Sequence, residues 1–288
     1  MKYGIREICD VVFKAKTKVQ IGNTTFEPGQ PVIYFDTLKT STMEGAATTV
    51  YAQGGKGNAR LMAWEGERTV TFTMEDALIS EIGLSVLTGA GLIEPTEAKP
   101  LKIHSTARFA KGDTYKVYET IDKTAEGKAY AIGMDENENV IEMVAAEGTV
   151  TAASGNAKAF TTFTNPVFTN DTKIKTILFD FYVVKASGAK QIEITADKFG
   201  GTYYVEASTL FRDSQGGDHP AEFIIPNAKV QSNFNFSLAS SGDPSTFTFT
   251  MDAFPDYTKF DKTRKVFAAI QVVDDEEAPL ADKNESDN

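Results

Sequence analysis

Residues 48–73 decide the fold, and they read TTVYAQGGKGNARLMAWEGERTVTFT. Thr48–Gln53 and Ala59–Trp64 have the residue types of strands, and the glycine-rich segment between them is typical of a hairpin tip. One interpretation is a long projecting hairpin that pairs with neighbouring copies, which would satisfy its open strand edges. The alternative is a hairpin that joins the sheet of its own domain. For the projecting hairpin, the predicted self-assembly residues are Thr49, Tyr51, Gln53, Lys56, Asn58, Arg60, Met62 and Trp64.

Strand patterns continue outside this segment. Val70 and Phe72 alternate with threonines, and so do Phe247, Phe249 and Met251. Alternation with a period of two indicates strands that have one buried and one solvated face. The sequence therefore predicts a mainly β protein.

Two further strands are expected. Phe234–Leu238 is predicted to pair with Phe247–Met251 as an antiparallel hairpin, because the residues between them are rich in turn formers. Ile177–Val184 is apolar nearly throughout, as a central strand would be.

One flanking helix is predicted after the strand Arg68–Thr73. Thr73 would cap it, and Glu75 and Asp76 would lie in its first turn, where the helix dipole favours acidic side chains. Gly89 stands where a C-terminal glycine stop is expected. The apolar residues that would share one helical face are Met74, Ala77, Leu78, Ile82 and Val86.

The domain organisation is predicted from shifts in composition. Residues 94–100 contain two prolines and indicate a linker, and Ser187-Gly188 is the best candidate for a second one. We expect a main domain in two parts, residues 1–100 and 187–273, with a small β-sandwich inserted at residues 101–186. Residues 274–288 are acidic and lack aromatic side chains, which predicts a disordered tail.

The composition argues against several classes of function. The chain has 40 acidic and 29 basic residues and a net charge of −11, which disfavours tight binding to a phosphate backbone. One cysteine and two histidines leave little material for disulfides, zinc sites or histidine-based catalysis. No basic-then-apolar leader is recognisable, and no run approaches the ~20 apolar residues that cross a bilayer. We therefore expect folding in the cytoplasm and no membrane contact.

Two segments resemble ligand loops but have simpler explanations. Asp135–Asn139 begins like a calcium loop, yet Val140 and Ala146 stand where that loop needs glycine and glutamate, which favours a charged hairpin turn. Gln53–Asn58 contains Gly-Lys but lacks the Ser or Thr and the following helix of a phosphate loop, which favours a hairpin tip.

The histidines and the cysteine give no catalytic pattern. His104 and Asp218-His219 lack a nucleophile elbow, and Gly216-Gly217 favours a surface turn around the second histidine. Cys9 has no histidine or second cysteine near it in sequence, which favours a buried structural thiol. We therefore predict no enzymatic activity, no metal and no cofactor.

The order of these segments resembles a known family. An N-terminal strand, a long Thr/Gly-rich hairpin, the strand Arg68–Thr73 running into a helix and terminal aromatic-alternating strands together resemble the tail tube (major tail) proteins of long-tailed bacteriophages. Residues 197–205, 223–230 and 242–247 are also similar to virion structural proteins of large phages. The resemblance covers residues 1–94 and 186–273 and leaves out the inserted segment.

This resemblance implies a β-sandwich or barrel with a flanking helix, a hexameric ring, and stacked rings that form a conduit for DNA ejection. It implies contacts with copies of itself and with sheath, tape-measure or tail-terminator proteins, and a place in the virion tail after assembly in the host cytoplasm. DNA would pass without tight binding, because an acidic or neutral wall repels phosphates. The alternatives are a capsid decoration or tail-terminator protein, or a carbohydrate-binding β-sandwich.

Overall fold

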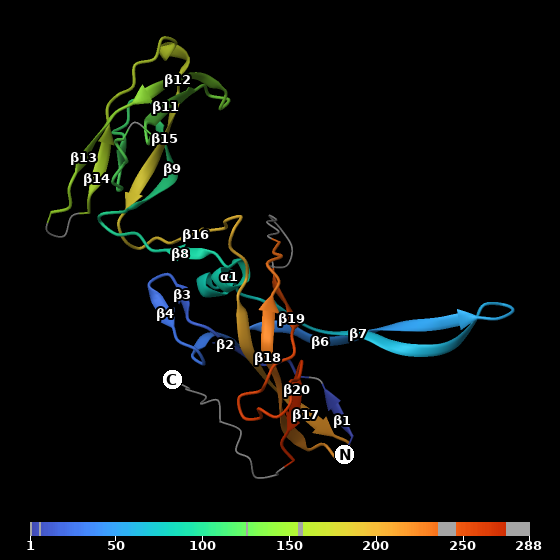
Figure 1. The fold of residues 1–288 in the computed structure, drawn as a ribbon. Coiled ribbons are helices and arrows are strands. Elements are labelled where there is room, and N and C mark those ends of the chain that lie inside the picture. The colour runs from blue at the N-terminus through green and yellow to red at the C-terminus, as the bar shows by residue number, and fades with distance from the viewer. Residues whose placement is uncertain (1, 6, 125, 155–157, 236–245, 275–288) are drawn as a thin grey trace. The chain divides into compact units, whose positions relative to one another are not determined.

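The computed structural model describes residues 2–5, 7–124, 126–154, 158–235 and 246–274 (Figure 1). The chain divides into two compact units, one formed by residues 1–92 with 192–288 and the other by residues 93–191. The sequence predicts the corresponding domain boundaries at residues 100–101 and 186–187. Among the described residues, no helix has the length and apolar character that a bilayer span requires.

The first unit is built on one antiparallel nine-stranded sheet. Its strand order is β5-β2-β17-β18-β19-β7-β6, with β1 added to β17 and β20 added to β18. Two short pairs, β3–β4 and β8–β16, lie outside this sheet. The strands of the sheet are β1 (Tyr3–Ile5), β2 (Asp10–Ala15), β5 (Pro31–Phe35), β6 (Leu38–Gly54), β7 (Ala59–Asp76), β17 (Thr202–Asp213), β18 (Asp218–Val230), β19 (Phe247–Ala253) and β20 (Ala269–Val272). The short strands are β3 (Val19–Ile21), β4 (Thr24–Phe26), β8 (Gly91–Ile93) and β16 (Gln191–Glu193).

Alternating apolar residues form the core on one face of this sheet. Every second residue of β19 is buried, as the alternation of Phe247, Phe249 and Met251 predicted. The ring of Phe35 contacts those of Phe13 and Phe249 edge-on, at centroid distances of 5.3 and 5.0 Å. Aromatic pairs in this arrangement add to the stability that burial supplies.

The one α-helix among the described residues, α1 (Glu81–Thr88), contributes Val86 and Leu87 to the same core. A Cβ placed on Gly83 would lie 3.5 Å from the ring of Phe249, which shows how closely this helix lies against the sheet. The prediction of a mainly β fold with one flanking helix is therefore confirmed.

The predicted start of the helix at Thr73 is wrong. Strand β7 continues to Asp76, and Thr73 pairs with Thr250 of β19. The helix begins at Glu81, where the Gly83 N–H donates to the Ser80 side chain at 2.9 Å. The apolar spacing around Met74 suits a helix locally, but the ladder with β19 satisfies the same backbone groups and buries Met74 completely. The predicted stop at Gly89 is confirmed by its φ of 68°.

The predicted hairpin between Phe234–Leu238 and Phe247–Met251 is not observed in the described residues. Phe234 and Asn235 lie outside any strand, and residues 236–245 lie outside the described part of the chain. Strand β19 pairs instead with β18 and β7.

The second unit contains two sheets around one core. The four-stranded sheet has the order β12-β11-β15-β9 and the three-stranded sheet the order β10-β14-β13. Phe163 of β14 stacks on Phe179 of β15 with centroids 4.3 Å apart, so the two sheets pack as a sandwich. The elements are β9 (Leu101–Ala110), β10 (Lys116–Val117), β11 (Ala129–Met134), β12 (Val140–Ala146), β13 (Gly148–Thr151), β14 (Phe160–Phe163), the short 3-10 helix η1 (Asp171–Lys173) and β15 (Thr176–Lys185).

Two predictions for this unit are confirmed. Ile177–Val184 lies within β15, a central strand of its sheet. Asp135–Asn139 connects β11 to β12 as a hairpin turn. In this turn the Asp135 carboxylate accepts hydrogen bonds from the backbone N–H groups of Asn137 and Asn139, at 2.8 and 2.9 Å. These bonds occupy the carboxylate within the turn.

Replacing Phe72 with alanine tests the core of the first unit. Phe72 is 2% exposed, and removing its ring is expected to lower the free energy of unfolding by about 3–5 kcal/mol through lost burial and a residual cavity. Urea denaturation measures this change. The control is Phe260→Ala at a ring that is 86% exposed, where a change within about 0.5 kcal/mol is expected. Equal effects at the two positions would contradict the assigned core.

Candidate functional site

The hairpin formed by β6 and β7 extends beyond the rest of its sheet. The two strands pair from Leu38–Asp76 to Gly54–Ala59, whereas β19 pairs with β7 only between Val70 and Asp76. Figure 1 shows β6 and β7 continuing past the end of β19 as a two-stranded arm. We call residues 44–69 the projecting hairpin; within the described residues, both of its outer edges lack a strand partner.

The tip of the projecting hairpin is a tight glycine turn. Gly55 and Gly57 have φ angles of 79° and 87°, and Asn58 has a φ of 48°. Positive φ is readily adopted by glycine and tolerated by asparagine, which explains why these residues stand here. The Asn58 side-chain amide donates to the Gln53 side chain at 3.3 Å. The interpretation of Gln53–Asn58 as a hairpin tip is confirmed.

Cross-strand pairing divides the projecting hairpin into two faces. Val50 lies opposite Trp64 and Ala52 opposite Met62, so these four side chains form an apolar face. The three large side chains are all exposed, Val50 by 60%, Met62 by 58% and Trp64 by 52%. Exposed apolar groups that gather on one surface are typical of an interaction site.

The other face is polar and carries a cation. Tyr51 pairs with Ala63 and Gln53 with Arg60 on this side, and the Arg60 guanidinium lies 4.1 Å from the centre of the Tyr51 ring. This contact holds the Arg60 side chain against the polar face, beside the tip, without neutralising its charge. Residues 45–64 contain Lys56 and Arg60 but no aspartate or glutamate, in a chain whose net charge is −11.

The eight predicted assembly residues therefore occupy three places. Thr49, Tyr51, Gln53 and Arg60 lie on the polar face, Met62 and Trp64 on the apolar face, and Lys56 and Asn58 at the tip. The prediction omitted two exposed apolar residues of the same hairpin. Val50 can be recognised once it is known to pair with Trp64. Leu61 lies at a β-bulge, which only the pairing register reveals.

His219 does not lie in the predicted surface turn. The turn is formed by the residues before Asp218, and His219 is a buried residue of β18. Its Nε2 lies 3.2 Å from the Asp213 carboxylate and its Nδ1 lies 3.3 Å from the Val273 carbonyl. Both ring nitrogens therefore face acceptors, which only the protonated imidazolium can satisfy.

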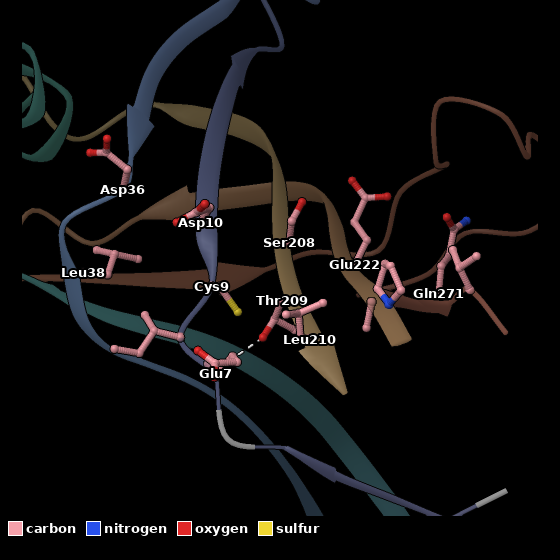
Figure 2. Close-up of a pocket in the computed structure, with 14 residues that line it drawn as sticks. Glu7, Cys9, Asp10, Asp36, Leu38, Ser208, Thr209, Leu210, Glu222 and Gln271 are labelled. Atoms are coloured by element: carbon pink, nitrogen blue, oxygen red, sulfur yellow. Dashed lines mark hydrogen bonds between the residues drawn. The ribbon is translucent and has the colours of Figure 1, made fainter. Parts of the chain in front are cut away.

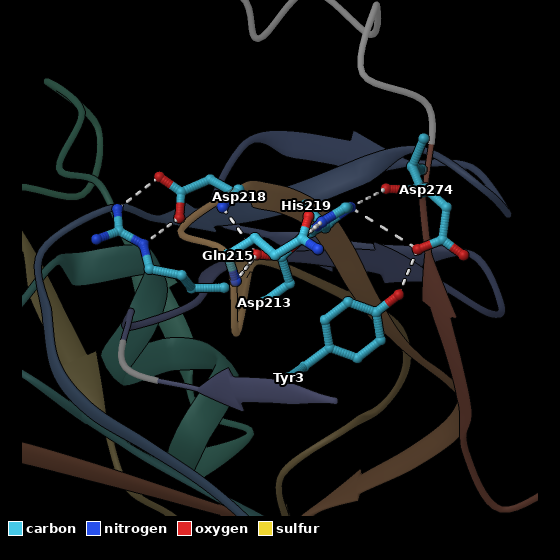
Figure 3. Close-up of polar contacts among 9 residues, drawn as sticks. Tyr3, Asp213, Gln215, Asp218, His219 and Asp274 are labelled. Carbon is cyan, nitrogen blue, oxygen red and sulfur yellow. Dashed lines mark hydrogen bonds and ion pairs between the residues drawn. The ribbon is translucent and has the colours of Figure 1, made fainter. Parts of the chain in front are cut away.

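Figure 3 shows that this histidine links three segments of the chain. The ring of Tyr3 contacts the His219 ring edge-on at 5.4 Å, and the Tyr3 hydroxyl donates to Asp274. The hydrogen bond with Asp213 is the main cause that raises the pKa of His219. Backbone N–H groups, that of Gly217 first, lower the pKa of Asp213 and keep it available as a partner.

The remaining candidates lie apart from one another. His104 belongs to β9 of the second unit, where its Nε2 lies 3.0 Å from Asp180. Cys9 is buried in the first unit, and this burial raises the pKa of its thiol, in agreement with the predicted structural role. Among the described residues, no three His, Cys, Asp or Glu side chains gather closely enough to hold a metal ion.

Protonation of His219 makes stability depend on pH. The pKa of His219 in the folded state is raised above 6.5. The stabilisation that the protonated side chain adds to the free energy of unfolding is therefore fully present below pH 6.5, and it is lost as the pH rises through the folded-state pKa. Urea midpoints between pH 5.5 and 9 are expected to fall with pH in the wild type. The variant His219→Gln is expected to lack that part of the decrease, and parallel profiles for the two proteins would contradict the assignment.

Comparison with known proteins agrees with this architecture. The model of the YomU/Tube protein family matches residues 4–267, which is nearly the whole chain. The match includes the projecting hairpin and the inserted second unit. No curated protein matches the chain. The resemblance to phage tail tube proteins is confirmed at the level of the family.

Proposed function

Because the chain belongs to the YomU/Tube protein family, we propose that this structural protein assembles with copies of itself into rings that stack into a phage tail tube. The observation that carries the proposal is the projecting hairpin, with two open strand edges and an exposed apolar face. A two-stranded hairpin is only marginally stable in water by itself. Contact with neighbouring copies would supply the pairing and burial that it lacks.

The two ends of the sheet support a head-to-tail arrangement. Strand β5 ends the sheet on one side and β6 ends it on the other, and within the described residues neither has a second neighbour. If β6 of one copy lies beside β5 of the next, each contact uses two different surfaces. Contacts of this kind close into a ring when the rotation between copies closes. The hexameric order of that ring is taken from the resemblance to tail tube proteins.

The charge of the chain suits a conduit for DNA. With a net charge of −11, the assembled wall would repel phosphates, whereas tight binding needs clustered cations and counterion release. DNA would therefore pass through the tube without being held. Sheath, tape-measure and tail-terminator proteins are the further partners that a virion tail of this type would offer.

Electron microscopy of the purified protein tests the proposal. Rings or stacked tubes are expected, and a species that stays monomeric at high concentration would overturn it. Deletion of residues 53–58 should abolish assembly while the fold survives, because exposed hairpin tips tolerate shortening. Circular dichroism and urea denaturation check the fold of the deletion variant. Normal tubes from this variant would show that the tip plays no part in assembly.

The apolar face offers a second test. The double substitution of Met62→Gln with Trp64→Ser is expected to leave the monomer's free energy of unfolding within about 1 kcal/mol, because both residues are exposed. It should nevertheless reduce ring formation, which sedimentation velocity measures. Phe260→Ser with Met143→Gln is the matched control, since these side chains are 86% and 56% exposed outside the hairpin. Equal assembly by both double variants would exclude the apolar face from the interface.

A further inference from the structure

An open groove lies on the first unit, away from the projecting hairpin. It encloses about 840 Å³ and is lined by the segments before β2 and β6 and by parts of β17, β18 and β20. Figure 2 shows Asp10, Asp36 and Glu222 along the upper part of the view and Glu7 in its lower part. Ile8, Leu38, Leu210 and Val273 supply apolar surface between them. We call this feature the acidic groove.

The acidic groove has an excess of negative charge. Four carboxylates line it, and no lysine or arginine is among its described lining residues. Asp10 accepts a hydrogen bond from the Tyr34 hydroxyl at 3.1 Å, but none of the four forms an ion pair within the described part of the chain. Among the described residues, no lysine or arginine lies in this groove to pair with its carboxylates.

Glu222 shows the consequence of that excess. Its pKa is raised, first by burial and then by the nearby carboxylate of Glu206. Lys14 reduces this effect, but Lys14 already forms an ion pair with Glu206. An additional cation in the acidic groove would stabilise the charged form of Glu222.

The hairpin tip carries the complementary groups. Lys56 and Arg60 form no ion pair among the described residues, and no carboxylate occurs between residues 45 and 64. Leu61, beside Arg60, lies at the β-bulge and is 68% exposed. The end of the hairpin thus carries two cations and one large exposed apolar side chain, which are the residue types that complement the carboxylates and the apolar surface of the groove.

Strand β6 separates these two surfaces within one molecule. Leu38 lines the acidic groove at one end of this strand, and Gly54 lies beside the tip at the other. Seventeen residues of extended chain span roughly 50 Å at ~3.3 Å per residue. A hairpin cannot return to the groove of its own chain over that distance, so a contact between the two surfaces joins different copies.

We propose that the acidic groove receives the hairpin tip of a second copy of this chain, with Lys56 and Arg60 against its carboxylates and Leu61 against its apolar surface. This inference rests on the proposed function, because it identifies the partner surface for the hairpin of a tube subunit. The contact is head-to-tail and can repeat around a ring. Complementary charge also fixes the register between subunits that otherwise repel each other.

Charge exchange tests the docking. The groove variant carries Glu7→Lys with Asp36→Lys, two exposed positions whose substitution spares the core. The tip variant carries Lys56→Glu with Arg60→Glu, and a combined variant carries all four changes. The matched control, Glu97→Lys with Glu136→Lys, alters net charge as the groove variant does but at exposed sites of the second unit. Circular dichroism verifies the fold, and sedimentation velocity with electron microscopy measures assembly of the full-length proteins.

The groove and tip variants are each expected to lower the apparent association constant about ten-fold or more, since like charges then meet in the interface. The combined variant should regain most of the loss, and the control should assemble as the wild type does. Wild-type assembly by the groove variant, or no recovery in the combined variant, would overturn the docking while leaving the tube proposal intact. A wild type that forms no rings would instead refute the tube proposal itself.

Discussion

The fold depends on where the backbone ladder of the nine-stranded sheet continues and where it ends. Strand β19 pairs with β7 from Asp76 to Val70 and reaches no further. On one side of that limit, the ladder holds Thr73 and Met74 in a strand that local spacing would have made helical. On the other side, β6 is the one neighbour of β7 within the described part of the chain, and the pair becomes the projecting hairpin. The two ends of this ladder therefore bound the two features: the helix begins after the ladder's end at Asp76, and the candidate assembly surface begins beyond its end at Val70.

Charge is distributed unevenly over a chain that is acidic as a whole. The hairpin segment 45–64 has two cations and no carboxylate, whereas four carboxylates and no lysine or arginine line the described acidic groove. Subunits with a net charge of −11 repel one another at long range. Local pairing of opposite charges offsets this repulsion only in one relative orientation, which links assembly to specificity.

Much of the fold and part of the site could be predicted from local patterns. The hairpin tip at Gln53–Asn58, the central strand Ile177–Val184 and the stop at Gly89 follow from turn chemistry, apolar runs and glycine at positive φ. His219 escaped prediction because its environment comes from Asp213, Val273 and Tyr3, which lie in three separate segments. Leu61 was not predicted because a β-bulge changes the direction in which side chains point, and the local sequence gives no signal of this bulge.

The sequence by itself determined the strand-rich composition, the glycine tip, the surplus of acidic residues and the cationic hairpin segment. These properties depend on residue types and on spacings of a few positions. Only the tertiary structure decided that the helix begins at Glu81, that Val50 and Trp64 share an apolar face, and that Glu7, Asp36 and Glu222 line one groove. The physical reason is that strand pairing joins residues as far apart in the sequence as Tyr3 and Asp213. Their register is set by backbone hydrogen bonds and burial that short sequence patterns do not encode.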